Sequence, residues 1–214
     1  MLPTLCIVGP SKVGKTELIE KLLVELKERG YKVATIKHAP RGFDLDKPGK
    51  DSWRYTQAGV DTLVLSSPEK LALIKNVDHD LSLAEISKLL GEDFDIILAE
   101  GFRKSKRPKI EVHRKGFEPP GAKGVIALVS DEILDISIPQ FSLEDTAGLT
   151  SFIEKKFLLN KSKERVSLFV SGKHIPLNPF LKSLFSKTLE AMVSTLKGVK
   201  EPKNIDLSIR REEE

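Results

Sequence analysis

The chain contains a complete phosphate-binding loop of the form G-x-x-x-x-G-K-S/T. Two glycines allow such a loop to curl, so that its backbone N–H groups point inward at a phosphate chain. Lys15 can then reach the β- and γ-phosphates, and the Thr16 hydroxyl can ligate Mg²⁺. The motif predicts the binding of a nucleoside triphosphate together with Mg²⁺. The eight residues are Gly9, Pro10, Ser11, Lys12, Val13, Gly14, Lys15 and Thr16.

A P-loop needs a partner acid for the metal, and Glu100 is the candidate. It ends the apolar run 95–100 and is followed by a glycine, as expected where a buried parallel strand reaches the edge of its sheet. From there the carboxylate can bind Mg²⁺ directly, bind it through water, or orient an attacking water. The alternative is an ordinary strand-end carboxylate. Beside a P-loop we favour the functional interpretation.

The segment 37–54 mixes carboxylates, basic residues and the single tryptophan. Asp44 and Asp46 are one residue apart, which places both carboxylates on one side of an extended chain. They could share a cation, or one could act as a base. Lys50 and Arg54 could approach a γ-phosphate, because the segment follows a strand that should end on the P-loop edge. A lack of periodicity predicts a mobile loop, and long irregular loops tend to be functional. The alternative is a turn rich in Asp, Pro and Gly.

Two further loops are candidates for ligand contact. The run 103–109 has five basic residues in seven and could hold an anion at the carboxyl edge of a sheet, although a solvated charged loop is an equally good interpretation. Ser130 and Asp131 follow a strand and are the candidates for contact with the nucleotide base. The guanine-specific tetrapeptide N-K-x-D does not occur, so these residues leave GTP and ATP open.

Strand-like and helix-like segments alternate over residues 1–159, which predicts an α/β fold: a three-layer P-loop NTPase with a mostly parallel sheet. The carboxyl edge of that sheet would gather the P-loop, Glu100 and the segment 37–54. Strands are expected at 4–8, 31–37, 61–66, 71–76, 95–100, 109–113 and 124–130, and helices at 17–27, at 83–90 behind a Ser82 cap, and at 142–156.

A polar stretch near residue 160 marks a boundary, and residues 160–214 form a small C-terminal α+β module to which the sequence gives no role. Strands are expected at 165–170, 174–177 and 205–209. A helix should begin after Asn178, with proline at its first position, and run to about Lys197. The module is too short to be very stable alone.

Composition limits the class of protein. The net charge is +4 and a single cysteine excludes a disulfide within the chain. One cysteine and four histidines also argue against a Cys/His metal cluster. The basic excess lies in 161–214, which indicates a solvated basic surface more than a nucleic-acid partner. No apolar run reaches membrane-span length and no signal peptide precedes the first strand, so we expect a cytoplasmic protein without a membrane partner.

Four stretches together resemble the MobB family, the molybdopterin-guanine dinucleotide biosynthesis adaptor proteins. The resemblance covers roughly residues 3–158 and implies a GTP-binding protein with weak hydrolysis, a homodimer, that serves the guanylyltransferase attaching GMP to the molybdopterin cofactor. The stretches are GPSKVGKT at 9–16, TIKHAPRGFDLDKPGKDSWRYTQAGVD at 35–61, ILAEGFR at 97–103 and PKIEVHR at 108–114.

The resemblance also implies roles for individual residues. It makes Gly14, Lys15 and Thr16 the phosphate and Mg²⁺ ligands and Glu100 the acid of the E-G-F motif. It places further residues in the family's signature loop: Asp44, Asp46, Lys50, Asp51 and Arg54.

Other classes of P-loop protein are alternatives. A metabolic kinase or ATP-dependent ligase acting on a small anionic substrate should carry an arginine-rich lid, and only the run 103–107 approaches one. A metallochaperone GTPase should carry a Cys/His site. A regulatory ATPase of the deviant P-loop kind needs a lysine directly after the first glycine, where Pro10 stands.

Overall fold

The computed structural model describes residues 2–44, 46–91, 93–159, 166–171, 173–199, 202 and 204–209. The chain forms two compact units, one that ends at residue 160 and one that begins at residue 161. None of the described helices is both long and apolar enough to cross a membrane.

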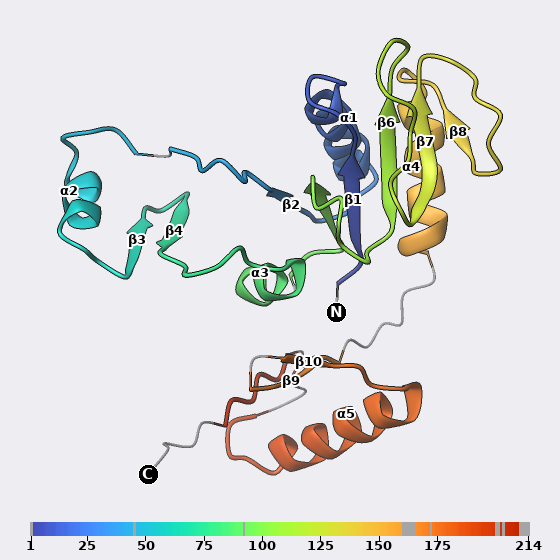
Figure 1. Cartoon of the computed structure of the whole chain (residues 1–214). Coiled ribbons are helices and arrows are strands. Elements are labelled where there is room, and N and C mark those ends of the chain that lie inside the picture. Colours follow the sequence, from blue (N-terminus) through green and yellow to red (C-terminus); the bar gives the residue numbers. More distant parts are fainter. Residues whose placement is uncertain are drawn as a thin grey trace. The chain divides into compact units, whose positions relative to one another are not determined.

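A six-stranded sheet forms the centre of the first unit, with the order β2-β5-β1-β6-β7-β8 and every neighbouring pair parallel (Figure 1). The predicted parallel α/β fold is confirmed. Strands β1 and β5 are almost wholly apolar because both faces of the sheet are covered. The strands are β1 (Thr4–Val8), β2 (Val33–Lys37), β5 (Ile96–Glu100), β6 (Lys109–His113), β7 (Val125–Ser130) and β8 (Gln140–Phe141).

Helices α1 (Lys15–Glu28) and α4 (Thr146–Phe157) pack on one face of this sheet, and α3 (Leu83–Leu90) packs on the other. Leu22 and Leu26 of α1 and Ile153 of α4 are fully buried against the sheet. The predicted Ser82 cap is confirmed, since its hydroxyl accepts a hydrogen bond from the Glu85 N–H in a capping box. Helix α4 begins later than expected, behind Asp145.

Coil segments, rather than helices, connect β5 to β6 and β6 to β7 on the face that carries α3. Phe102 and Ala122 from these segments join the apolar cluster on that face. Lys109, at the amino end of β6, is buried, and its ammonium donates to the carbonyl oxygens of Ser105 (2.5 Å) and Arg107 (3.1 Å). The idea that the whole basic run faces a ligand crevice is therefore wrong for Lys109, because its buried ammonium is used by carbonyl oxygens of the run itself.

Between β2 and α3 the chain forms a short helix, α2 (Asp51–Gln57), and a hairpin of β3 (Thr62–Ser66) and β4 (Leu71–Lys75). Both predicted strands exist, but they pair only with each other, antiparallel, in a separate two-stranded sheet (Figure 1). A short turn permits antiparallel pairing, whereas parallel neighbours need a long crossover. Helix α2 corrects the expectation of an irregular loop through residue 54.

The second unit contains β9 (Leu168–Val170), β10 (Lys173–Ile175) and α5 (Pro179–Ser194). The predicted helix start is confirmed, because the Asn178 side chain accepts a hydrogen bond from the Leu181 N–H at 2.8 Å. The helix ends before Lys197, and 205–209 has no regular structure, so the last predicted strand is wrong. A strand needs a neighbour for its hydrogen bonds, and the described part of this unit pairs only β9 with β10. Part of the predicted strand 165–170 and the acidic end lie outside the described residues.

Candidate nucleotide-binding site

The P-loop links the carboxyl end of β1 to the start of α1, and its backbone geometry requires the two glycines. Gly9 has φ 144°, and a Cβ there would lie 2.4 Å from the Val112 carbonyl oxygen. Gly14 has φ 98°, and a Cβ there would lie 3.2 Å from the Arg114 guanidinium. Lys12 also takes a positive φ of 64°, which is uncommon for a residue with a side chain. The loop is therefore tightly curled, as phosphate binding requires.

The side chain of Lys15 lies across the loop that precedes it. Its ammonium donates to the Pro10 carbonyl oxygen at 2.6 Å. Burial lowers the pKa of Lys15 from its usual value, Glu100 opposes that shift, and Lys37 adds to it through repulsion. A lysine that is partly desolvated beside other charges is prepared to exchange its carbonyl partner for a phosphate anion.

The Thr16 hydroxyl donates to Oε2 of Glu100 at 3.2 Å, which brings together the two residues predicted to bind a metal. Thr16 is in the first turn of α1 and Glu100 ends β5, the strand beside β1. A hydroxyl and a carboxylate at the edge of the phosphate loop are the oxygen ligands that Mg²⁺ prefers. The residues present therefore fit this ion.

Lys37, at the carboxyl end of β2, is a site residue that the sequence analysis did not single out. Its ammonium lies 3.3 Å from Oε2 of Glu100, the same oxygen that Thr16 contacts. The available signal was positional: Lys37 ends a strand as Glu100 does, and the two are register partners.

Arg114, directly after β6, is a second residue that was missed. Its Nε donates to the Val13 carbonyl oxygen at 3.1 Å, and its guanidinium lies 3.9 Å from the Glu17 carboxylate. It therefore supports the P-loop from the neighbouring strand. Two signals were available: Arg114 directly follows the predicted strand 109–113, and it ends the stretch 108–114 that resembles the MobB family.

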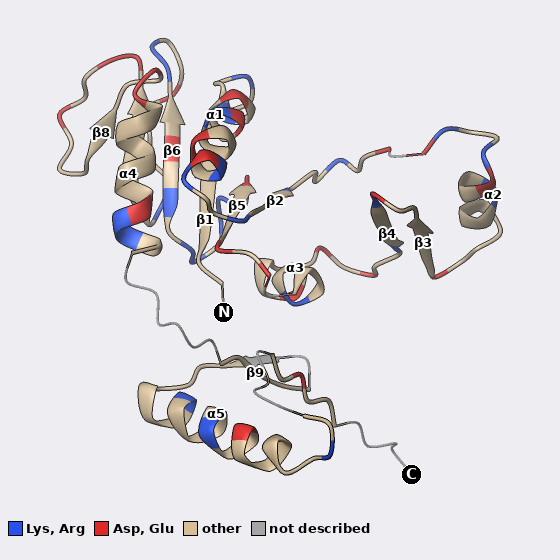
Figure 2. Ribbon diagram, turned by 180° about the vertical axis from the view of Figure 1, so that it is seen from behind, with Lys and Arg blue, Asp and Glu red and all other residues tan. Residues whose placement is uncertain are grey.

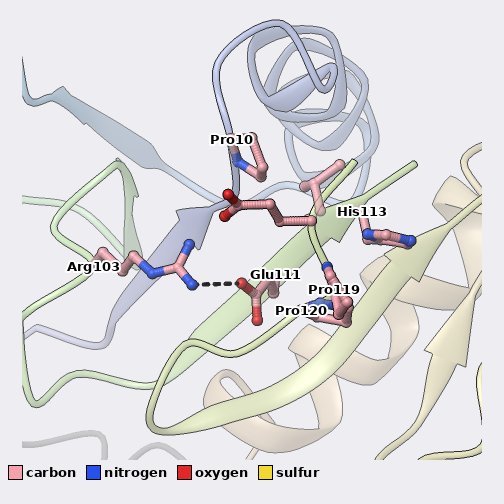
Figure 3. Close-up of a pocket in the computed structure, with 8 residues that line it drawn as sticks. Pro10, Arg103, Glu111, His113, Pro119 and Pro120 are labelled. Carbon is pink, nitrogen blue, oxygen red and sulfur yellow. Dashed lines mark ion pairs between the residues drawn. The ribbon is translucent and has the colours of Figure 1, made fainter. Parts of the chain in front are cut away.

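A small cavity of about 20 Å³ lies beside Pro10 at the end of β6 (Figure 3). The guanidinium of Arg103 pairs with Oε1 of Glu111 at 3.4 Å, and Oε2 accepts from the N–H groups of Gly121 (3.1 Å) and Ala122 (3.0 Å). His113 is buried, and its Nε2 lies 2.7 Å from Glu132. Glu111 therefore holds the coil between β6 and β7 in place. The cavity itself has about the volume of a water molecule.

Ser130 and Asp131 lie at the carboxyl end of β7, on the same edge as the P-loop. The buried Ser130 hydroxyl accepts from the Glu132 N–H at 3.1 Å, and the exposed Asp131 accepts from the Lys115 N–H at 2.8 Å. Both side chains shape this loop, and Asp131 also faces solvent.

The signature-loop residues lie elsewhere in the unit. Asp46 accepts from the Lys47 N–H at 2.8 Å, and Arg54 lies 3.8 Å from Asp51 within α2. Asp44 and Lys50 are exposed. Among the described residues, no hydrogen bond or ion pair joins these side chains to the P-loop. The structure brings Thr16 and Glu100 together with the P-loop, but not the signature-loop residues 44–54.

Comparison with known proteins identifies the family. The family model for molybdopterin guanine dinucleotide synthesis protein B, MobB, matches residues 4–131. A molybdopterin-guanine dinucleotide biosynthesis adapter protein of Haemophilus influenzae is 33% identical over 72% of this chain and 88% of its own length. A putative adapter protein of Methanocaldococcus jannaschii is 27% identical over 95% of both chains.

Solved structures agree with this match. The Bacillus subtilis MobB structure has a TM-score of 0.61 at 27% identity, and covers 73% of this chain and 98% of its own. A crystal structure of molybdopterin-guanine biosynthesis protein B has a TM-score of 0.56 at 28% identity, over 72% and 99%. The sheet, the P-loop and these relatives agree: the chain belongs to the MobB family.

Proposed function

We propose that this protein is a GTP- and Mg²⁺-binding adaptor with weak GTPase activity that acts in molybdenum cofactor biosynthesis. In this role it assists the guanylyltransferase that attaches GMP to molybdopterin, in the cytoplasm. The names of its relatives support the pathway. The observation that carries the nucleotide part is the contact between the Thr16 hydroxyl and the Glu100 carboxylate, 3.2 Å apart beside an intact P-loop.

The chain's own groups have distinct tasks in this proposal. The curled loop and Lys15 bind the phosphates, while Thr16 and Glu100 hold Mg²⁺, which supplies positive charge to the phosphate oxygens when bound. Glu100 is also the group placed to orient a water for hydrolysis. Ser130 and Asp131 are the proposed contacts to the guanine base, because their loop follows β7 on the P-loop edge.

We also propose a homodimer that forms through the β3–β4 hairpin. Val64 faces Leu73 across the hairpin, and Leu71 lies further along the same face. All three side chains are more than half exposed. A hairpin alone is marginally stable, and a second copy would cover these residues and can extend the sheet through an open edge.

We assign partner binding to the charged signature loop, which contains Asp44, Asp46, Lys50 and Arg54. It belongs to the same connection as the hairpin and makes no described contact with the P-loop. We propose that the guanylyltransferase or the molybdopterin meets it there. Trp53, half buried in α2, can report that encounter by its fluorescence.

The arrangement disfavours a metabolic kinase or ligase. The run 103–107 that resembled a lid is a short coil between β5 and β6, and its first arginine, Arg103, pairs with Glu111. A lid needs side chains that are free to close over a substrate.

Titration with labelled GTP tests the nucleotide assignment. We expect Lys15→Ala to keep the fold and weaken binding by about 2–3 kcal/mol, because a charge-assisted contact is lost. This corresponds to a Kd that rises about 30- to 150-fold. Lys27→Ala, an exposed lysine at the other end of α1, is the matched control and should bind as wild type does.

A guanylation assay tests the adaptor role. Wild type should co-purify with the guanylyltransferase and raise formation of the dinucleotide cofactor, and Lys15→Ala should raise it less. Equal GTP affinities for wild type and Lys15→Ala would remove the nucleotide assignment. Normal GTP binding without any effect on guanylation would remove the adaptor role alone.

A further inference from the structure

Lys37 stands level with Glu100 on the neighbouring strand. The two are register partners between β2 and β5, and Glu100 is in turn level with Ile7 of β1. The row of three crosses parallel strands just before the P-loop begins at Gly9. Neighbouring strands are about 4.8 Å apart, so the backbone of Lys37 lies about 10 Å from β1. A lysine side chain can cover much of that distance.

The backbone of Lys37 is fixed, but its ammonium is weakly held. The His38 N–H donates to the Glu100 carbonyl oxygen at 3.0 Å, which fastens the strand end. The Lys37 side chain is 65% exposed, and its distance of 3.3 Å from Glu100 is longer than that of a strong charged hydrogen bond. Such an exposed ion pair contributes little stability, so the ammonium can move to a stronger anion at low cost.

Lys37 also approaches the same atom as the metal-binding hydroxyl. Oε2 of Glu100 is contacted by the ammonium of Lys37 and by the hydroxyl of Thr16, which follows Lys15 in the chain. Two lysines, one from the loop and one from an outer strand, therefore meet the edge where phosphates bind. The P-loop motif accounts for Lys15 alone.

We propose that Lys37 binds the third phosphate of the nucleotide and makes the site prefer a triphosphate to a diphosphate. The inference rests on the proposed function, because it takes the P-loop to be a nucleotide site. A terminal phosphate offers several anionic oxygens, and a contact to Lys37 is a charge-assisted hydrogen bond. Cationic side chains supplied within the same chain stabilise the transferred phosphoryl group in other P-loop proteins.

Equilibrium titration in Mg²⁺ at fixed ionic strength tests this inference, with a non-hydrolysable GTP analogue compared with GDP. We expect Lys37→Ala to weaken analogue binding about 10-fold and to leave GDP within about twofold, because only the analogue offers the third phosphate. Lys37→Arg should keep most of the preference. Lys32→Ala, an exposed lysine just before the other end of β2, is the matched control and should change neither affinity.

A second arm separates direct contact from an effect through Glu100. Glu100→Gln removes the charge that Lys37 balances. If Lys37 contacts the third phosphate, adding Lys37→Ala to Glu100→Gln still weakens the analogue selectively. If Lys37 acts only by neutralising Glu100, the added substitution has no effect and the inference is overturned.

The remaining outcomes are also distinguishable. Equal losses for the analogue and GDP in Lys37→Ala would overturn the inference. If the wild type prefers the triphosphate and Lys37→Ala keeps the same preference, the inference is refuted and the proposed function is not. A wild type that binds neither nucleotide would refute the proposed function and, with it, the role of Lys37.

Discussion

At the carboxyl edge of the parallel sheet, strand pairing or a tight backbone turn fixes the backbone position of the site residues. Between β2 and α3, by contrast, the chain is stabilised mainly by its own local contacts. Glu100 and Lys37 are level on paired strands, and Gly9 fits beneath the Val112 carbonyl. In the hairpin, Val64, Leu71 and Leu73 face solvent. Figure 2 marks charged residues along the ribbon of both regions, so charge alone does not separate them.

The difference separates two kinds of function. Binding a phosphate chain requires donors that are fixed before the ligand arrives, because each ordered group then costs less entropy on binding. Meeting a protein partner requires apolar surface that is exposed until the partner covers it. The first region should therefore tolerate few substitutions, and the second should tolerate many while the monomer folds.

The largest expected effect comes from adding one methyl group at Gly9. A Cβ there would lie 2.4 Å from the Val112 carbonyl oxygen, so Gly9→Ala should abolish nucleotide binding and lower the free energy of unfolding by about 3 kcal/mol. Gly42→Ala, at a positive φ of 84° in open space, should lower it by only about 1 kcal/mol. Denaturant titrations measure both changes, and similar losses would contradict the contrast between the regions.

A smaller effect, on assembly alone, is expected from Leu73→Lys. The charged side chain would replace an apolar one at the centre of the exposed hairpin face, so sedimentation should show monomers in place of dimers. Nucleotide affinity should stay within about twofold, because the hairpin makes no described contact with the P-loop. Ile133→Lys is the control, since Ile133 is 97% exposed outside the hairpin. If Leu73→Lys still dimerises, or if Ile133→Lys becomes monomeric, the dimer interface does not lie on the hairpin as proposed.

The smallest effect concerns pH at the junction of the two regions. Hydrogen bonds from Ser82, and then from His79, lower the pKa of Glu85 from 4.5 to about 2. The carboxylate therefore stabilises the start of α3 above pH 4.5, and this contribution is lost as the pH falls toward 2. Glu85→Gln should flatten the acid limb of the stability curve slightly. The Glu85 side chain is exposed, so salt should weaken the effect; identical acid limbs would exclude it.

The sequence predicted the parts of the fold whose signals are local. The P-loop, the apolar run before Glu100, the Ser82 cap and the Asn178 helix start each depend on residues within one or two turns. The short turn between β3 and β4 indicated a hairpin, but its separation from the main sheet was not evident, because alternation identifies a strand and not the sheet that it joins. Helix α2 was missed because it is short and mostly polar, and the strand expected at 205–209 has apolar alternation but no described partner.

For the site, too, the residues with local sequence signals were predicted and the others were not. Thr16 and Glu100 come from motifs, and their contact follows from parallel strands ending at one edge. The roles of Lys37 and Arg114 depend on neighbouring strands that the sequence does not pair, so their positions at strand ends were too weak a signal to single them out. Asp44 and Asp46 carried a strong compositional signal, yet their place away from the P-loop depends on how the long connection folds.

The contact between His38 and Asp80 has a consequence for how the chain can change. Nε2 of His38 lies 3.0 Å from the Asp80 carboxylate, and His38 itself is fastened to the end of β5. The contact thus joins the residue after β2 to a residue just before α3, so the connection between them is a loop with adjacent ends. Such a segment can be lengthened, shortened or exchanged between homologues without displacing a strand. The partner contact that we propose for this segment can therefore change while the residues at the carboxyl edge of the sheet stay the same.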